Sequence, residues 1–179
     1  MDRRQQKTRA AVYQAFTELL KTKSYSSITI QDIIDEADIG RSTFYSHFET
    51  KDDLLNVLCT EIFDHVFSGH LEKETTHNFS KDSNSLEPKL THILYHLMDN
   101  KRYVQGILQG ESGEIFMRYF KQHLTEVFEK DIVDVPDFVP KDYYINHLVC
   151  GFADTVRWWM SNGGTPEEIT GYYCRLYLE

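Results

Sequence analysis

Residues 28–51 read Ile28-Thr-Ile-Gln-Asp-Ile-Ile-Asp-Glu-Ala-Asp-Ile-Gly-Arg-Ser-Thr-Phe-Tyr-Ser-His-Phe-Glu-Thr-Lys51. Apolar residues recur at helical spacing on both sides of Asp38-Ile39-Gly40, which predicts two short helices joined by a tight turn. We expect the first helix from about Ile30 to Ala37 and the second from about Arg41 to Phe48. Aspartate tolerates a left-handed backbone better than most residues and glycine adopts it without steric cost, so the sequence fits such a turn.

The side chains of these two helices divide into an apolar set and a polar set. Thr29 fits a cap at the start of the first helix, with Asp32 at the third helical position. The inward set comprises Ile33, Ala37, Ile39, Phe44 and Phe48. The outward set on the second helix comprises Arg41, Ser42, Thr43, Tyr45 and His47. A helix-turn-helix reads base edges in the DNA major groove from the N-terminal residues of its second helix, so Arg41 and Ser42 are candidates for base contacts.

The same stretch resembles the TetR/AcrR family of transcriptional regulators. The matching residues, at many fixed spacings, are Ile28, Thr29, Ile33, Ala37, Thr43, Phe44, Tyr45, His47, Phe48, Lys51 and Leu54. Four positions depart from the family pattern: Ile34 replaces a small alanine, Asp38 the turn glycine, Ile39 a valine and Gly40 the capping serine. All four remain compatible with the expected turn and helix start, although Gly40 lacks a hydroxyl that could cap the helix or contact a phosphate.

The resemblance implies specific roles in DNA binding. It makes Arg41, Ser42 and Gln31 the candidate base readers. It places Thr29, Thr43, Tyr45, His47 and Lys51 on phosphates, where hydroxyls and point charges fix the protein on the duplex without reading sequence.

Net charge is distributed unevenly along the chain. The whole sequence carries a formal charge of −9, which is unusual for a DNA-binding protein. Residues 1–51 hold 8 Lys/Arg against 7 Asp/Glu, whereas residues 52–179 hold 11 against 21, so the excess acid lies outside the helix-turn-helix. Phosphate contact needs local basic groups, and the N-terminus supplies Arg3, Arg4, Lys7 and Arg9. The alternative is that these four belong to a solvated terminus.

Helical periodicity dominates the remainder, which predicts an all-α chain of about nine helices. We expect an N-terminal three-helix helix-turn-helix domain at residues 1–50 and a C-terminal helical ligand-binding and dimerisation domain at 51–179. Thr50 is expected to cap a long fourth helix that connects the two. Residues 70–85 are polar and lack periodicity, so a loop is expected there. Thr165-Pro166-Glu167-Glu168 predicts the start of the last helix.

The last two helices carry more apolar and aromatic residues than one buried face requires. Aromatic-rich surfaces are enriched at oligomer interfaces, and two-fold dimers are the commonest assemblies. We therefore expect a homodimer through the last two helices, which would match a palindromic DNA site. The tail from Val149 to Glu168 also resembles the C-terminal region of one TetR-like subgroup. The alternative is that these aromatic residues fill the core of one subunit.

The resemblance implies that the helices expected between about residues 86 and 161 enclose a cavity that takes a small-molecule inducer. The candidate lining residues here are Tyr103, Ile107, Phe116, Tyr119, Phe120, Leu124, His147 and Trp158. An aromatic set with a few polar tips is typical of a small-molecule pocket and fits an apolar or aromatic ligand. Each residue alone is more often an ordinary core residue.

Other classes of site find little support in the sequence. The cysteines Cys59, Cys150 and Cys174 are few, odd in number and far apart, which favours a reduced, cytoplasmic protein without a disulfide framework. Apolar runs stay short of the roughly 20 residues that span a membrane. His92 and His96 are four residues apart, but no third metal ligand follows at a fixed spacing, so solvated or core-edge histidines are favoured. No catalytic motif appears, so neither an enzyme nor a cofactor is expected.

The sequence therefore predicts a dimeric, ligand-responsive transcriptional regulator that acts as a repressor, binds a double-stranded DNA operator and is released by an inducer. A competing hypothesis is a TetR-like co-regulator that acts through protein–protein contacts without specific DNA binding. The two classes differ in phosphate contact, and therefore in how steeply DNA binding depends on salt.

Overall fold

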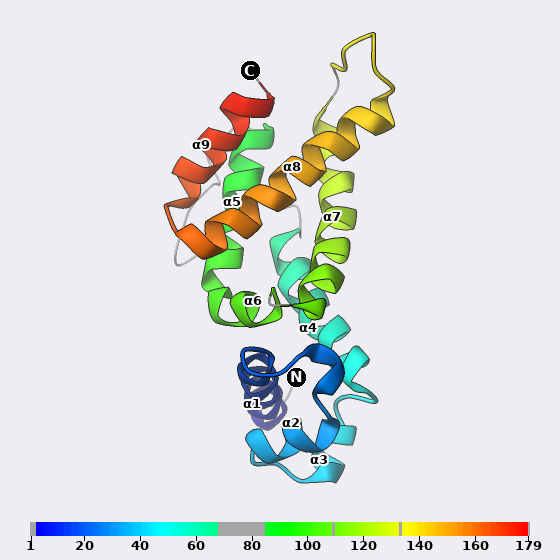
Figure 1. Ribbon diagram of the computed structural model, residues 1–179, viewed down its shortest axis with the longest axis vertical. Coiled ribbons are helices and arrows are strands. Elements are labelled where there is room, and N and C mark those ends of the chain that lie inside the picture. The colour runs from blue at the N-terminus through cyan, green and yellow to red at the C-terminus, as the bar shows by residue number, and fades with distance from the viewer. Residues whose placement is uncertain (1–2, 68–84, 109, 133, 179) are drawn as a thin grey trace. The chain divides into compact units, whose positions relative to one another are not determined.

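The computed structural model describes residues 3–67, 85–108, 110–132 and 134–178. Within these ranges the chain forms nine α-helices and a short 3₁₀ turn, and no strand (Figure 1). The helices are α1 (Arg3–Leu20), α2 (Ile30–Glu36), α3 (Arg41–Tyr45), α4 (Lys51–Val66), α5 (Leu86–Asp99), α6 (Lys101–Ile107), α7 (Glu111–Asp131), α8 (Lys141–Asn162) and α9 (Pro166–Tyr177); the 3₁₀ turn is η1 (Tyr25–Ser27). The all-α prediction is confirmed. Most of the loop expected at 70–85 lies outside the described residues.

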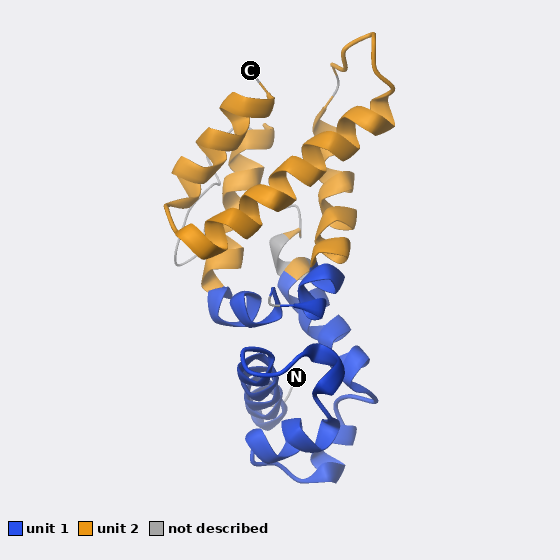
Figure 2. Cartoon of the chain, viewed as in Figure 1, with its two compact units in different colours: residues 1–62, 100–116 blue, residues 63–99, 117–179 orange. Residues whose placement is uncertain are grey.

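The chain divides into two compact units (Figure 2). Unit 1 comprises residues 1–62 and 100–116, and unit 2 comprises residues 63–99 and 117–179. Unit 1 therefore contains α6 and the start of α7 as well as the helix-turn-helix, which differs from the expected division at residue 50. The assignment of separate functions to residues 1–50 and 51–179 stays a prediction.

The start of α2 is fixed by a reciprocal cap. The Thr29 hydroxyl accepts a hydrogen bond from the Asp32 backbone N–H (3.1 Å), and the Asp32 carboxylate accepts one from the Thr29 N–H (2.8 Å). Both satisfy donors that a helix start leaves without partners. The Lys23 ammonium also donates to Asp32 (2.8 Å), and this contact, followed by those from Thr29, lowers the pKa of that carboxyl.

The second helix of the motif is shorter than expected, because α3 ends at Tyr45 instead of Phe48. The Ser46 hydroxyl donates to the Thr43 carbonyl (2.7 Å), so a side chain takes a carbonyl that could otherwise continue the helix. The backbone N–H of Phe48 still donates to the Phe44 carbonyl (3.0 Å), which keeps Phe48 buried against the motif.

The turn between α2 and α3 places its left-handed residue at Asp38, with φ +50°. The Ile39 N–H reaches back to the Ile34 carbonyl (3.2 Å), as expected where a helix ends in a left-handed residue. Gly40 has an extended backbone (φ −75°, ψ 150°) that any residue adopts, and a Cβ added there would meet only the Thr43 hydroxyl at 3.7 Å. The turn therefore uses the left-handed conformation at Asp38 and not at Gly40, although the sequence allowed it at both.

The core of unit 1 is built from α1, the helix-turn-helix and α6. Ile33, Phe44 and Phe48 are buried as expected, whereas Ala37 and Ile39 are half-buried. Helix α6 lies against α1 at Gly106, where an added Cβ would approach the Thr17 carbonyl oxygen to 2.7 Å. This contact therefore requires glycine, because a side chain would push the two helices apart.

The core of unit 2 is a column of aromatic rings. Phe63 stacks on Phe120 (ring centroids 5.7 Å apart), Phe120 lies against Phe152 (6.4 Å), and Phe152 meets Tyr173 edge-to-face (5.1 Å). The Tyr173 hydroxyl donates to the Leu148 carbonyl (2.8 Å), so its polar end is satisfied although the residue is buried. No helix within the described ranges is both long enough and apolar enough to cross a membrane.

The left-handed conformation of Asp38 gives a test of the turn. Asp38→Val is expected to lower the free energy of unfolding by about 1–2 kcal/mol, because a β-branched side chain is strained at positive φ. Asp38→Gly is expected to keep or raise it by up to about 1 kcal/mol. Gly40→Ala is the matched control in the same turn, with an expected change of less than about 1 kcal/mol, because the lower entropy of the unfolded chain is opposed by the loss of a favoured N-cap residue. Urea unfolding measures all three, and equal effects of Val and Gly at residue 38 would contradict the strain argument.

Candidate nucleic-acid interface

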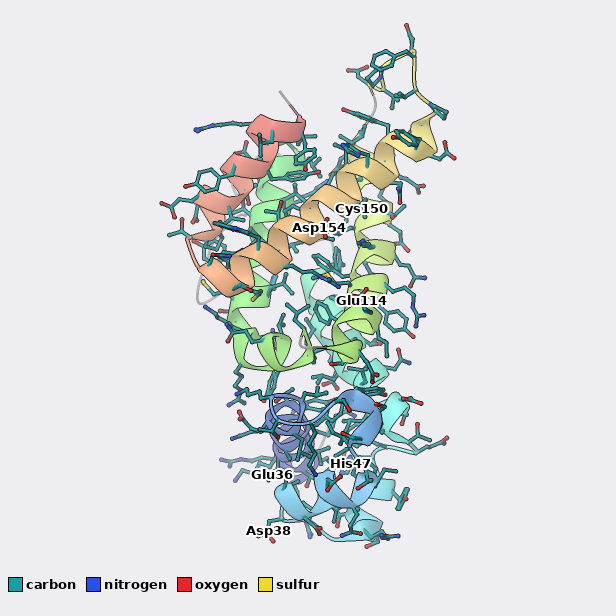
Figure 3. The ribbon with its side chains drawn as sticks, viewed as in Figure 1. Glu36, Asp38, His47, Glu114, Cys150 and Asp154 are labelled. Atoms are coloured by element: carbon teal, nitrogen blue, oxygen red, sulfur yellow. The ribbon has the colours of Figure 1, made fainter. Side chains whose placement is uncertain are left out.

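Helix α3 presents a polar face to solvent. Arg41, Ser42 and Tyr45 are exposed, whereas Phe44 is fully buried and fixes the rotation of the helix about its axis. Figure 3 shows Asp38 at the end of unit 1, in the turn that precedes this face. The candidate base readers Arg41 and Ser42 therefore lie on the accessible side of α3, at its first two positions.

A hydrogen-bonded chain connects α3 to α2 on this face. The Arg41 guanidinium donates from Nη2 to Oε1 of Gln31 (2.5 Å), and Gln31 donates from Nε2 to Oδ1 of Asp35 (2.7 Å). All three residues are exposed. Gln31, expected to read bases, therefore has both ends of its amide engaged by protein groups.

A polar groove of about 320 Å³ lies beside α3 in unit 1. It is lined by Arg4, Gln5, Thr8, Thr43, Ser46 and His47. The groove brings two of the expected phosphate contacts, Thr43 and His47, together with a cation from α1. Hydroxyls and a guanidinium are the groups that hold phosphate oxygens, so its chemistry fits an anion.

Lys51 makes internal contacts at the start of α4. Its ammonium donates to the Tyr25 carbonyl (2.6 Å) and the Ile28 carbonyl (2.8 Å), and lies 4.4 Å from the centre of the Tyr25 ring. An ammonium has three N–H donors, so these two carbonyls leave one for another acceptor. Lys51 thus connects α4 to the segment that precedes α2, and its expected contact with a phosphate stays a prediction.

The turn η1 gathers further contacts within unit 1. The Tyr25 hydroxyl donates to Asp52, and the pKa of Tyr25 is raised, first by burial and then by this carboxylate. The Glu111 carboxylate accepts a hydrogen bond from the Ser26 N–H (3.0 Å). The segment before α2 is therefore held by the first residues of both α4 and α7.

Two more residues of the expected phosphate-binding set have internal partners. The Thr29 hydroxyl both caps α2 and donates to Asp32 (2.8 Å). Arg9 donates to the Tyr13 hydroxyl (2.7 Å) and pairs with Glu61, which ties α1 to α4, and its side chain is only 14% exposed. Tyr13 in turn donates to Glu61 (2.8 Å), so burial and this carboxylate raise the pKa of Tyr13.

The residues expected to line an inducer cavity come from both units and differ in exposure, and their role stays a prediction. Phe120 and Leu124 are fully buried in unit 2, and Tyr119 is half-buried there. Tyr103, Ile107 and Phe116 belong to unit 1; Ile107 and Phe116 are fully buried and Tyr103 is half-buried. His147 and Trp158 are exposed on α8. The structure thus separates the last two from the core residues, because they lie on a different face of their helix.

Helices α8 and α9 form an open, mostly apolar groove of about 650 Å³. Its lining residues are Gly151, Asp154, Thr155, Trp158, Ile169, Tyr172, Tyr173, Leu176 and Tyr177. Trp158 is 54% exposed, Tyr172 52% and Leu176 78%. Figure 3 places Asp154 and Cys150 on α8, the first of them at this groove. The aromatic residues of the tail thus serve two purposes, since some fill the core and others remain in contact with solvent.

His92 and His96 are buried on α5, with their Nε2 atoms 2.9 Å apart. They are core residues, not the solvated ones that the sequence also allowed. Among the residues that the structure describes, no group of three His, Cys, Asp or Glu side chains is placed to hold a metal ion.

Comparison with known proteins identifies the family. Residues 12–58 match the family described as "Bacterial regulatory proteins, tetR family", and residues 84–177 match "Transcriptional regulator C-terminal region". The chain belongs to the TetR family of transcriptional regulators. A TetR regulator from Streptococcus agalactiae 2603V is 32% identical, with a TM-score of 0.65 over 98% of this chain and 96% of that one.

Two curated HTH-type regulators match over shorter stretches. The uncharacterized HTH-type regulator YxbF of Bacillus subtilis is 42% identical over 71 residues, which is 37% of this chain and 19% of YxbF. The dhaKLM operon transcriptional activator DhaS of Lactococcus lactis is 26% identical over 127 residues, 71% of this chain and 62% of DhaS. The matched regions therefore cover less than two thirds of both relatives.

Sequence reasoning missed two features of this TetR-family site. It did not place Arg4 beside Thr43 and His47, because no local pattern brings the start of α1 to the end of α3. It also missed Asp35, although the four-residue spacing from Gln31 on one helix was a usable signal for a hydrogen-bonded pair.

Lys51→Met tests the internal role of this ammonium, since methionine keeps most of the stem but removes the charge and its donors. We expect the free energy of unfolding to fall by about 1–3 kcal/mol, because two part-buried carbonyls lose a charged partner. Lys101→Met, at an exposed lysine of the same unit, is the control and is expected to change stability by less than about 0.5 kcal/mol. Chemical unfolding measures both. Lost DNA affinity with unchanged stability would show that Lys51 acts on phosphate alone.

Proposed function

We propose that this regulator binds a palindromic DNA operator as a homodimer and changes its affinity when a small molecule binds. The observation that carries the proposal is the exposed polar face of α3, with Arg41 and Ser42 at its start, beside a polar groove that contains Arg4. A surface that reads bases needs neighbouring groups that hold phosphates, and the exposed face of α3 beside this polar groove supports that combination.

The near-neutral charge of residues 1–51 makes the placement of these groups important. Arg41 and Ser42 are proposed to contact base edges. Thr43, Tyr45 and His47 are proposed to contact phosphates, and Arg4 supplies a positive charge at the same groove. Few cations are available, so bulk electrostatic attraction is weak and specific contacts must supply more of the affinity.

Dimerisation is proposed to occur through the α8–α9 groove. Trp158, Tyr172 and Leu176 expose a continuous apolar lining that water contacts in a single chain. A second copy of the chain would bury this lining, and aromatic residues of this kind dominate protein interfaces. Two α3 helices related by a two-fold axis then fit the two halves of a palindrome.

The inducer is proposed to bind within unit 2, beside the aromatic column that contains Phe120, with the buried Leu124 one turn further along α7. An apolar ligand with an aromatic ring would complement such a lining. Binding changes DNA affinity only if the ligand prefers one of two arrangements of the regulator. We propose repression as the outcome of DNA binding. Activation is the second candidate, since the relative DhaS is named an activator.

Arg41→Ala tests base reading. The variant is expected to lose about 1–3 kcal/mol of binding free energy for a duplex selected from a random pool, and to relax preference at one base pair in each half-site. Arg118→Ala, at an exposed arginine of α7, is the control and should leave preference unchanged. Competition binding against duplexes with single base-pair changes gives the measurement. Unchanged preference after Arg41→Ala would remove Arg41 from the base-reading set.

A salt titration with random duplex separates this function from that of a co-regulator without DNA binding. Phosphate contacts release counterions, so the affinity of a DNA-binding regulator should fall steeply as salt concentration rises. No binding at low salt would support the co-regulator.

Leu176→Glu tests the proposed dimer interface. Placing a carboxylate in the apolar lining is expected to weaken dimerisation at least about tenfold, because the charge loses water without gaining a partner. Phe138→Glu is the control, since Phe138 is 87% exposed in the α7–α8 loop, away from the groove. Sedimentation over a range of protein concentrations gives the dissociation constants. A monomeric wild-type chain, or equal weakening by both changes, would contradict the interface.

A further inference from the structure

The hydrogen-bonded chain between α2 and α3 has a direction. Arg41 is the first residue of α3, and its guanidinium reaches across to Gln31, the second residue of α2. Gln31 reaches along its own helix to Asp35, one turn later. The carboxylate thus orients the amide, and the amide orients the guanidinium. Because α2 and α3 are held by buried contacts, this chain fixes an otherwise flexible arginine to a rigid element.

The contacts also limit what Gln31 can do. Its carbonyl oxygen accepts from Arg41 at 2.5 Å, and its nitrogen donates to Asp35 at 2.7 Å. A glutamine that reads adenine uses both ends of its amide on the base. Gln31 would have to give up both protein partners to do so. The geometry therefore favours a role for Gln31 in holding Arg41 instead of reading a base itself.

Arg41 keeps the donors that a base contact needs. A guanidinium has five N–H donors, and the contact with Gln31 uses one of them. The remaining donors include enough for a two-pronged contact with O6 and N7 of guanine, the commonest specific contact of arginine in the major groove. An arginine in a fixed orientation loses less conformational freedom when it makes that contact.

Gln31 is the middle residue of the hydrogen-bonded chain, and its neutral amide leaves the positive charge of Arg41 in place. A carboxylate next to Arg41 would neutralise the guanidinium and repel the DNA, whereas an amide accepts the same hydrogen bond without carrying charge. A cation at the first position of a helix opposes the helix dipole, and no acidic residue in the first turn of α3 offsets it. Helix stability therefore does not explain an arginine at this position. Gln31 separates the Arg41 cation from Asp35 and leaves its charge available to DNA.

We propose that Gln31 is a positioning residue, held by Asp35, that aims the Arg41 guanidinium at a guanine in each half of the operator. Gln31 determines how sharply the guanine is distinguished, and Arg41 makes the contact. This inference rests on the proposed function, because it assigns a specificity role within the same DNA-binding surface.

The test is a double-mutant cycle on the full chain, using the best duplex that the wild type selects from a random pool. The measured quantity is discrimination, the ratio of affinities for that duplex and for duplexes with single base-pair changes. Arg41→Ala is expected to lower discrimination at one base pair by about tenfold or more. Gln31→Ala is expected to lower it at the same base pair by about three- to tenfold. The double variant should be no worse than Arg41→Ala, since a positioning residue has no effect once its partner is gone.

Further variants separate orientation from charge. Asp35→Asn keeps an oxygen that accepts from Gln31 and should retain discrimination within about twofold, whereas Asp35→Ala should lower it at the base pair affected by Gln31→Ala. Gln31→Glu should lower affinity for all duplexes, including random ones, and make binding less sensitive to salt. Gln122→Ala, at an exposed glutamine of α7, controls for a surface amide and should change nothing.

Two results would overturn the proposal. If Gln31→Ala changes preference at a different base pair from Arg41→Ala, with additive effects, then Gln31 reads a base directly. If Gln31→Ala leaves discrimination unchanged while Arg41→Ala lowers it, Gln31 does not position Arg41. Failure of the proposed function gives a different result from these two. The wild type would then select no duplex from the random pool, which would also overturn the positioning role.

Discussion

The helix-turn-helix depends on how the segment before α2 is held. The Lys51 ammonium donates to the Tyr25 and Ile28 carbonyls, and Asp52 accepts from the Tyr25 hydroxyl. Charge-assisted hydrogen bonds are stronger than neutral ones, particularly where water is partly excluded. These contacts tie the first residues of α4 to the start of the motif, and the cap formed by Thr29 then sets where α2 begins. Together with the buried Phe44, which fixes the rotation of α3, this connection supports the helix-turn-helix that presents the exposed face.

The distribution of charge gives the DNA-binding surface its character. An acidic chain whose first 51 residues carry almost no net charge cannot rely on general attraction to phosphate. Several of the cations there also serve the fold: Lys51 supports η1, and Arg9 pairs with Glu61. Arg4 and Arg41 lie on the exposed groove and on α3. Specificity in this regulator is therefore expected to come from a few groups in fixed orientations, with two-fold symmetry multiplying their effect.

The C-terminal helices divide their aromatic residues between two environments. Phe152 and Tyr173 pack inward and are satisfied there, the tyrosine through its hydrogen bond to a backbone carbonyl. Trp158 and Tyr172 lie on the same two helices but face solvent in a groove. A helix of 22 residues has room for both faces, so a count of aromatic residues could not separate core from interface. For the same reason the sequence alone places His147 and Trp158 in one set with Phe120, although the first two are exposed and Phe120 is buried.

Local sequence determined the helices, their caps and the family. Helical periodicity, the Thr29–Asp32 and Thr165–Glu168 caps and the spacing of Thr43 to Phe48 act over a few residues, so each could be predicted and is observed or matched. Only the tertiary structure decided which polar groups lie together: Arg4 and His47 line one groove, Lys51 donates to two carbonyls, and Arg41 donates to Gln31. These residues belong to different helices or to segments far apart in the sequence. No local sequence pattern predicts the packing that brings them together. The sequence predicted DNA contacts for Gln31 and Lys51, and only the packing of α2, α3 and α4 shows which protein groups each side chain contacts.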